Sequence, residues 1–60
     1  MSPERFQEHR ERLGLSRAAF CAALGIAPNS GTAYELGRRP IPQTVALAIA
    51  ALLHGLPPAE

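Results

Sequence analysis

The stretch from Ser16 to Gly37, SRAAFCAALGIAPNSGTAYELG, decides the fold. It contains two segments of helix-forming residues, and Gly25 stands between them, where a tight turn requires a positive φ. Cys21 is a small side chain one helical turn before that glycine, where two crossing helices can approach each other. This pattern predicts two short helices that cross at a steep angle through a turn of about three to four residues.

A helix is expected on each side of that turn. The first covers residues 17–24 and follows a serine, a residue type that caps helix N-termini. The second covers residues 28–36, with Pro28 in the first helical position and Ala27 as a poor N-cap. A slightly later start that is capped by Asn29 is the alternative for this second helix.

Two further helices flank this central stretch. Ser-Pro-Glu at residues 2–4 forms a helix start, and Gly14 ends that helix. A last helix covers residues 43–54. Because eleven Ala and eight Leu outnumber three Ile and one Val, helices are favoured over strands. We expect an all-α fold, a compact four- to five-helix bundle that forms a single domain over residues 1–60.

The composition argues against an enzyme. A chain of 60 residues buries only about 60% of its unfolded surface, which leaves little room for an active-site pocket. The sequence has no carboxylate pair and no glycine-rich phosphate loop. Cys21 falls at a helix contact, so it is expected to be a buried structural thiol and not a metal ligand beside His9 or His54. We expect no enzymatic activity, no cofactor, no metal and no small-molecule ligand.

The sequence also predicts a cytoplasmic protein. A single cysteine cannot form an internal disulfide, which fits a reducing compartment. No apolar stretch of a signal peptide follows the first residues. The longest uncharged apolar run, residues 45–53, is about half the length needed to cross a bilayer, so no membrane partner is expected.

Positive charge gathers in the middle of the chain. Between residues 12 and 40 there are four arginines and one glutamate, a net charge of +3, whereas the whole chain carries +1. Such a basic surface can face an anionic partner.

The motifs of this chain resemble those of the Cro/C1-type helix-turn-helix domains of phage repressors and small bacterial regulators. The similarity covers nearly the whole chain, and its matching segments are LGLSR at 13–17, LGI at 24–26, YELGRR at 34–39 and PIPQTV at 40–45. The segment 39–45 is also similar to that of short repressors of phages and mobile elements, some of which are autorepressors associated with anti-CRISPR genes. The resemblance implies a lambda-repressor-like bundle with its motif at 16–37, in the cytoplasm of a bacterial cell or phage-infected host.

The resemblance also implies which residues read DNA bases. The second motif helix enters the major groove and contacts bases from its N-terminal turns. On the matching positions the expected base-reading residues are Pro28, Asn29, Thr32 and Ala33, with Ser30 beside them. Asn29 is the strongest candidate because its amide can pair with N6 and N7 of adenine, although it could instead cap the helix. Thr32 can hydrogen-bond a base or touch a thymine methyl, whereas Pro28 and Ala33 offer only apolar contact.

Four further residues are expected at the DNA backbone. Ser16 and Arg17, at the start of the first motif helix, match the phosphate anchor of the family. Arg38 and Arg39 follow the recognition helix and are expected to flank the groove on its other side. The alternative is that these arginines are simply solvated.

Arg10 and Glu35 resemble the buried ion pair that ties the first helix to the third in this family. An arginine on an otherwise apolar helix face needs a partner, and Glu35 is the only acid in the middle of the chain. Two exposed charges are the alternative.

The chain departs from the family pattern at two positions. Gly31 stands where the family usually has Val or Ile, and Ala33 stands where it has a longer side chain. We expect Phe20, which is larger than the leucine usual in the family, to fill the space beside Gly31. Otherwise the third helix would be loosely held.

The last helix is apolar all round, which predicts a homodimer. The expected core side is made of Val45, Ala48, Ile49, Leu52, Leu53 and Leu56. The opposite side contains Ala46 and the expected dimer interface, Leu47, Ala50, Ala51 and His54. A chain this short cannot cover both sides by itself, although an alanine-rich face can also tolerate water.

The expected function is therefore a sequence-specific regulator that binds double-stranded DNA, most simply a homodimeric autorepressor on a palindromic operator. The alternative is an antitoxin or adaptor that applies the apolar last helix to a different protein.

Overall fold

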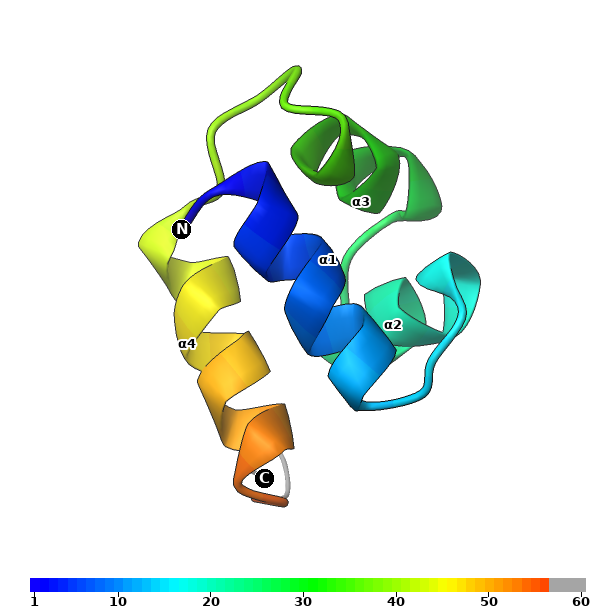
Figure 1. The fold of residues 1–60 in the computed structure, drawn as a ribbon, viewed down its shortest axis with the longest axis vertical. Helices are drawn as coiled ribbons and strands as arrows, with labels where there is room; N and C mark the ends of the chain where they lie inside the picture. The colour runs from blue at the N-terminus through cyan, green and yellow to red at the C-terminus, as the bar shows by residue number, and fades with distance from the viewer. Residues whose placement is uncertain (57–60) are drawn as a thin grey trace.

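The computed structural model describes residues 1–56, and within them the chain forms four helices and no strand (Figure 1). In chain order these are α1 (Pro3–Arg12), α2 (Arg17–Leu24), α3 (Pro28–Glu35) and α4 (Gln43–Leu53). The all-α prediction is confirmed, and each expected helix ends within one residue of the observed end where a range was predicted.

Serine caps begin the first two helices, as the sequence predicted. The Ser2 hydroxyl accepts a hydrogen bond from the Arg5 N–H at 3.2 Å, and the Ser16 hydroxyl accepts one from the Ala19 N–H at 3.2 Å. Each bond satisfies a backbone donor that has no partner inside its helix.

The start of α3 is different, because it has no side-chain cap. Ala27 is the N-cap residue with an extended backbone, and Pro28 occupies the first helical position. The alternative start capped by Asn29 is therefore wrong. Pro28 makes the early start possible since its fixed φ suits the first turn and it has no N–H to satisfy.

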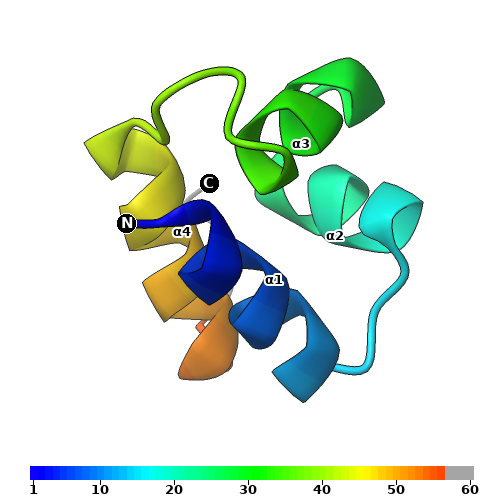
Figure 2. The same cartoon turned by 45° about the horizontal axis from the view of Figure 1, so that its top comes forward.

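Gly25 ends α2 and sets the direction of the chain into α3. Its φ of 72° places it in the left-handed region, where only glycine is free of strain. The next N–H, that of Ile26, donates to the Cys21 carbonyl at 3.0 Å and closes the end of the helix. Two residues later α3 begins, so α2 and α3 form a tightly connected pair (Figure 2).

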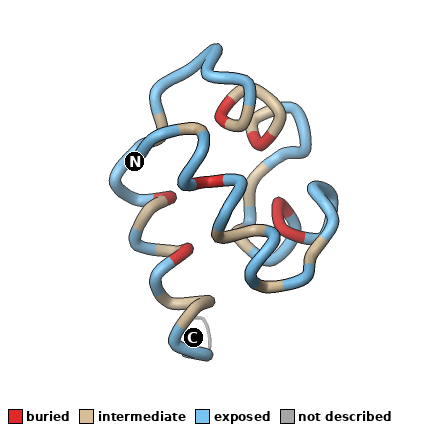
Figure 3. The backbone as a smooth tube through the Cα atoms, in the orientation of Figure 1, coloured by how far each residue is buried: buried red, intermediate tan, exposed pale blue. Residues whose placement is uncertain are grey.

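The core is a single cluster to which every helix contributes (Figure 3). Phe6 of α1 lies at its centre and makes edge-to-face contacts with Phe20 of α2 and Tyr34 of α3, at ring-centroid distances of 5.1 and 6.0 Å. Val45 and Ile49 of α4 complete the buried set. Aromatic pairs of this kind each contribute about 0.5–1.5 kcal/mol beyond the area that they bury.

The contact between α2 and α3 is closed by Cys21 and not by Phe20. Gly31 is buried against the Cys21 sulfur, and a Cβ atom built on Gly31 would overlap that sulfur far inside the 3.0 Å that real Cβ atoms keep. The expectation that Phe20 fills the space beside Gly31 is wrong, because only atoms of Cys21 lie within 4 Å of a Cβ built on Gly31, and the Phe20 ring packs on Phe6 instead. The missing side chain lets the two helices approach closely and does not leave α3 loosely held.

The last helix packs by one side only. Val45 and Ile49 are buried, and Ala48, Leu52 and Leu53 are half-buried, as expected for the core side. Leu56 is 60% exposed, so its assignment to the core is wrong. Helix α4 ends at Leu53 and Gly55 has a φ of 69°, so the helical spacing that placed Leu56 inward does not continue to that residue.

The packing leaves α3 and α4 on different sides of the bundle (Figures 1 and 2). Helix α2 packs against both α3 and α4, and α1 packs against α3. Among the described residues, no helix is long and apolar enough to span a membrane.

Candidate nucleic-acid interface

One side of α3 faces away from the core and carries the residues predicted to read bases. At about 100° per residue, a stripe at positions 28, 29, 32 and 33 lies opposite the buried residues Gly31 and Tyr34. Pro28 and Asn29 are exposed, whereas the other two members of the stripe, Thr32 and Ala33, are half-buried. Ser30 is half-buried beside the stripe. We call the four residues Pro28, Asn29, Thr32 and Ala33 the α3 stripe.

The amide of Asn29 is available to a ligand. It does not cap α3, whose N-cap residue is Ala27, and it makes no hydrogen bond within residues 1–56. An exposed amide with both its donor and its acceptor unused can pair with adenine in the two-bond geometry expected from the sequence.

The hydroxyl of Thr32 is partly engaged. It donates a hydrogen bond to the Pro28 carbonyl one turn earlier, at 3.2 Å. The oxygen can still accept a hydrogen bond, and the methyl group stays free. Thr32 can therefore accept from an exocyclic amino group of a base or contact a thymine methyl, but it is not a free donor.

Leu36 extends the α3 stripe and was not predicted from the sequence. It lies four residues after Thr32 at the C-cap of α3, where its backbone is still helical, and it is 55% exposed. The spacing of four residues would have identified it, but a leucine in that position is first assigned to the core. It adds apolar surface at the C-terminal end of the α3 stripe.

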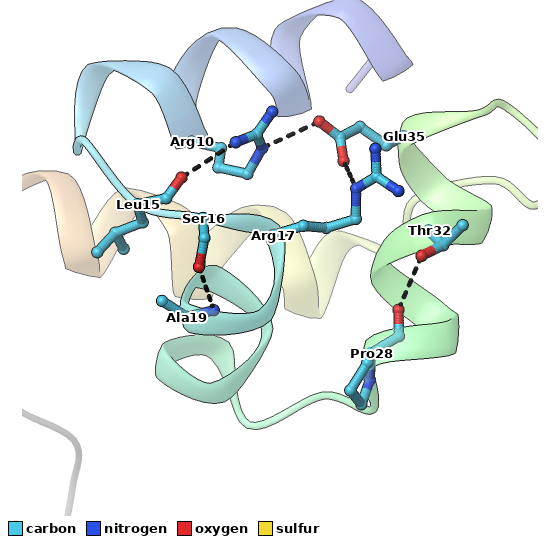
Figure 4. Close-up of polar contacts among 8 residues, drawn as sticks. All are labelled: Arg10, Leu15, Ser16, Arg17, Ala19, Pro28, Thr32 and Glu35. Carbon is cyan, nitrogen blue, oxygen red and sulfur yellow. Dashed lines mark hydrogen bonds and ion pairs between the residues drawn. The ribbon is translucent and has the colours of Figure 1, made fainter.

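Arg10 and Glu35 lie in contact beneath this surface (Figure 4). The Arg10 Nε donates to Glu35 Oε1 at 3.0 Å, and the Arg10 Nη1 donates to the Leu15 carbonyl at 3.0 Å. The side chain of Glu35 is only 4% exposed, so the alternative of two exposed charges is wrong. The pair joins α1 to α3 and also fixes the loop before α2.

Arg17 shares the same carboxylate, which the sequence did not predict. Its Nε lies 2.6 Å from Glu35 Oε2, although the N–H does not point at that oxygen as a hydrogen bond would require. The Arg17 side chain is still 48% exposed. Ser16 beside it is exposed, and its oxygen caps α2 while its O–H can still donate.

The two arginines after α3 differ from each other. Arg38 is exposed, and its side chain makes no hydrogen bond or ion pair within residues 1–56. Arg39 lies back on α3, with its guanidinium carbon 5.6 Å from the centroid of the Tyr34 ring. Its Nη2 also donates a long hydrogen bond of 3.4 Å to the Ser30 hydroxyl. Arg39 thus covers one edge of α3, while Arg17 covers the other edge at Glu35.

A family model described as a helix-turn-helix domain matches residues 4–60. The chain belongs to the helix-turn-helix domain family. No curated protein and no solved structure gives a significant match to it. In helix-turn-helix domains in general, the second helix of the motif is the one that enters the DNA major groove.

The helix-turn-helix domain has a second exposed surface on α4, away from the motif. Leu47 is 62% exposed, Ala50 and His54 are exposed, and Ala51 is half-buried. These four residues follow the spacing of one helix face, which we call the α4 face. No charged residue lies in α4, so this face is apolar apart from the histidine that follows the helix.

Proposed function

We propose that this helix-turn-helix domain is a homodimeric transcriptional repressor that recognises a palindromic operator through α3. The observation that carries the proposal is the α3 stripe, which presents an unused asparagine amide between two edges occupied by arginines. Base recognition and backbone attraction are thus combined on one surface, as a sequence-specific DNA-binding protein requires.

Base readout rests mainly on Asn29. Its amide pairs with adenine through N6 and N7 in the major groove, a contact that discriminates against other bases by about 1–3 kcal/mol. Thr32 accepts a hydrogen bond or meets a thymine methyl. Pro28, Ala33 and Leu36 provide apolar contacts to methyl groups and sugars, and Ser30 lies close enough to the α3 stripe to assist.

Backbone binding rests on the arginines at the edges of α3. Arg17 and Ser16 face a phosphate from the start of α2, and Arg38 reaches one from the loop after α3. Arg39, which packs on Tyr34, adds positive charge on the same side. Each phosphate that is neutralised steepens the dependence of the association constant on salt, with a slope of about −0.9 per contact.

Dimerisation is proposed through the α4 face. Two copies that pair Leu47, Ala50, Ala51 and His54 about a two-fold axis would remove exposed apolar surface from water. The described chain measures 31 × 21 × 18 Å, which is similar to the spacing of about 34 Å between successive major grooves on one side of DNA. Two protomers of this size, paired through the α4 face, can place one α3 in each half-site.

The experiment is selection of binding sites from a random pool of duplex DNA, followed by footprinting on the region upstream of the gene. An enriched palindrome with half-sites one helical turn apart supports the operator, and protection of the upstream region supports autorepression in the cytoplasm. Selection that enriches no sequence would reject specific readout. Failure to bind DNA while α4 captures a defined protein partner would instead favour the adaptor alternative.

A further inference from the structure

We propose that Glu35 is a positioning residue for DNA binding, because its buried carboxylate fastens Arg10 into the fold through one oxygen and holds Arg17 at the edge of the α3 stripe through the other. This inference rests on the proposed function and deepens it. Glu35 is too buried to contact DNA itself, and its role is to position Arg17, which does contact DNA. It extends the expected Arg10–Glu35 pair to a group of three.

The contacts of Arg10 with Glu35 and Leu15 stabilise the fold. Arg10 is 18% exposed, its Nε donates to Glu35 Oε1, and its Nη1 donates to the Leu15 carbonyl. These bonds engage Arg10 within the protein through Glu35 Oε1 and leave Oε2 without a hydrogen bond. Arg10 is therefore not a candidate for contact with a phosphate.

The second half of the group faces outward. Arg17 approaches Glu35 through Nε, whereas its two terminal nitrogens make no hydrogen bond with residues 1–56. Those terminal nitrogens are the pair that an arginine uses to grip a phosphate with two parallel bonds. Two guanidinium groups and one carboxylate leave a net charge of +1, so the group as a whole still attracts an anion.

The position of Glu35 on α3 explains why Arg17 is placed usefully. Glu35 follows Pro28 by seven residues, nearly two helical turns, so both lie along the same edge of α3. Figure 4 shows Arg17 reaching from the start of α2 to Glu35 at this edge. Its guanidinium thus borders the α3 stripe at a fixed place relative to the residues that read bases.

A mobile Arg17 that leaves Glu35 to meet DNA is the opposing possibility. Glu35 Oε2 is buried and accepts no hydrogen bond from any described residue, so the departure of Arg17 would leave a buried anionic oxygen without its nearest cation. Remaining in place avoids that loss and also avoids the entropy of ordering a free arginine when DNA binds. The geometry therefore favours an Arg17 side chain that stays beside Glu35 when DNA binds.

The test uses Arg17→Ala, Glu35→Gln and the double variant, measured by fluorescence anisotropy with a mixed-sequence duplex of about three helical turns. Glutamine keeps the shape of Glu35 and can still accept from Arg10, but it loses the charge that holds Arg17. Circular dichroism at each salt concentration verifies that every variant is folded. If the wild-type protein does not bind the duplex, DNA binding itself is refuted. If the wild-type protein binds but Glu35→Gln has the same effect on affinity with and without Arg17→Ala, only the positioning role is refuted.

For Glu35→Gln, we expect the dissociation constant to rise about 2- to 10-fold while the salt slope is unchanged, because a freed Arg17 keeps its charge but must be ordered on binding. Arg17→Ala lowers the slope by about 0.9. In the Arg17→Ala background, Glu35→Gln has no further effect on affinity. Tighter binding by Glu35→Gln would show that Glu35 sequesters Arg17, and an equal loss in both backgrounds would show that Glu35 acts only through the fold.

Arg17→Lys tests the proposal even if Glu35→Gln does not fold, because it leaves the bonds between Arg10 and Glu35 untouched. Lysine keeps the positive charge but has no Nε to face Glu35 and no pair of terminal nitrogens. We expect weaker binding with an unchanged salt slope. Wild-type affinity for Arg17→Lys would overturn the proposal.

Discussion

The close contact between Cys21 and Gly31 can be tested by enlarging the side chain at residue 31 and shortening the side chain at residue 21. Gly31→Ala places a methyl group where the Cys21 sulfur now lies. In a helix, alanine is favoured over glycine by about 1 kcal/mol, but overpacking a buried contact costs about 1–3 kcal/mol. We therefore expect Gly31→Ala alone to lower the free energy of unfolding by about 1 kcal/mol, since the sulfur must leave its place in an already packed contact.

The compensating change is Cys21→Ala, which removes the sulfur. By itself it deletes one buried heavy atom and costs about 1 kcal/mol in lost contact. With the sulfur gone, the nearest atom to the new methyl group is the Cβ of residue 21 at 3.8 Å, an ordinary van der Waals distance. The double variant should therefore be about as stable as the wild type, which corresponds to a coupling energy of about 2 kcal/mol.

Urea and thermal unfolding, followed by circular dichroism, measure all four proteins of this cycle. In a domain of this size each 1 kcal/mol shifts the melting temperature by about 4–8 °C, so the single variants and the double variant are easily distinguished. If Gly31→Ala alone is neutral or stabilising, the sulfur rotates away at little cost and the argument fails. A double variant less stable than either single variant would also refute it, because the two changes would then be independent.

Three further outcomes are expected. Asn29→Ala should weaken binding by about 1–3 kcal/mol at a single base position of the selected site, and an equal loss for every sequence would remove Asn29 from base readout. Leu47→Glu places two charges at the proposed dimer interface, so sedimentation should show monomers where the wild type is dimeric; a wild type that is monomeric at high concentration would refute the interface. Ser2→Ala removes the cap of α1 and should lower stability by about 1 kcal/mol in urea unfolding, whereas Ser2→Asp, which can still cap, should keep it.

Local chemistry made much of this fold predictable. Ser2 and Ser16 act on N–H groups only three residues away, and Gly25 acts within one turn, so these signals depend little on the rest of the chain. The same holds for the start of α3 at Pro28, although the sequence left a later start open. The order and extent of the helices followed from these few residues.

Contacts between distant residues were harder to predict. The approach of α2 to α3 depends on where a sulfur atom lies relative to Gly31, and no spacing rule contains that distance. Phe20 was assigned to that contact by size alone, whereas the structure uses it as a partner of Phe6. Leu56 was misplaced because helical spacing was extended past the end of α4 and the left-handed Gly55.

The candidate site shows the same division. The residues expected on the outward side of α3 and the pairing of Arg10 with Glu35 both followed from the resemblance to a known family. The second cation at Glu35 and the packing of Arg39 on Tyr34 did not follow, because long flexible side chains reach partners that are chosen by the whole fold.

The α3 stripe makes no contribution to the buried core, which consists of residues on the opposite side of the same helix and on the other three helices. Substitutions in the α3 stripe, through which we propose that bases are recognised, can therefore accumulate without loss of folding. Descendants of this protein could acquire new target sequences through a few exchanges at Asn29 and Thr32, while Gly31 and Tyr34 stay under selection for packing. Recognition and architecture are in this sense free to evolve at different rates.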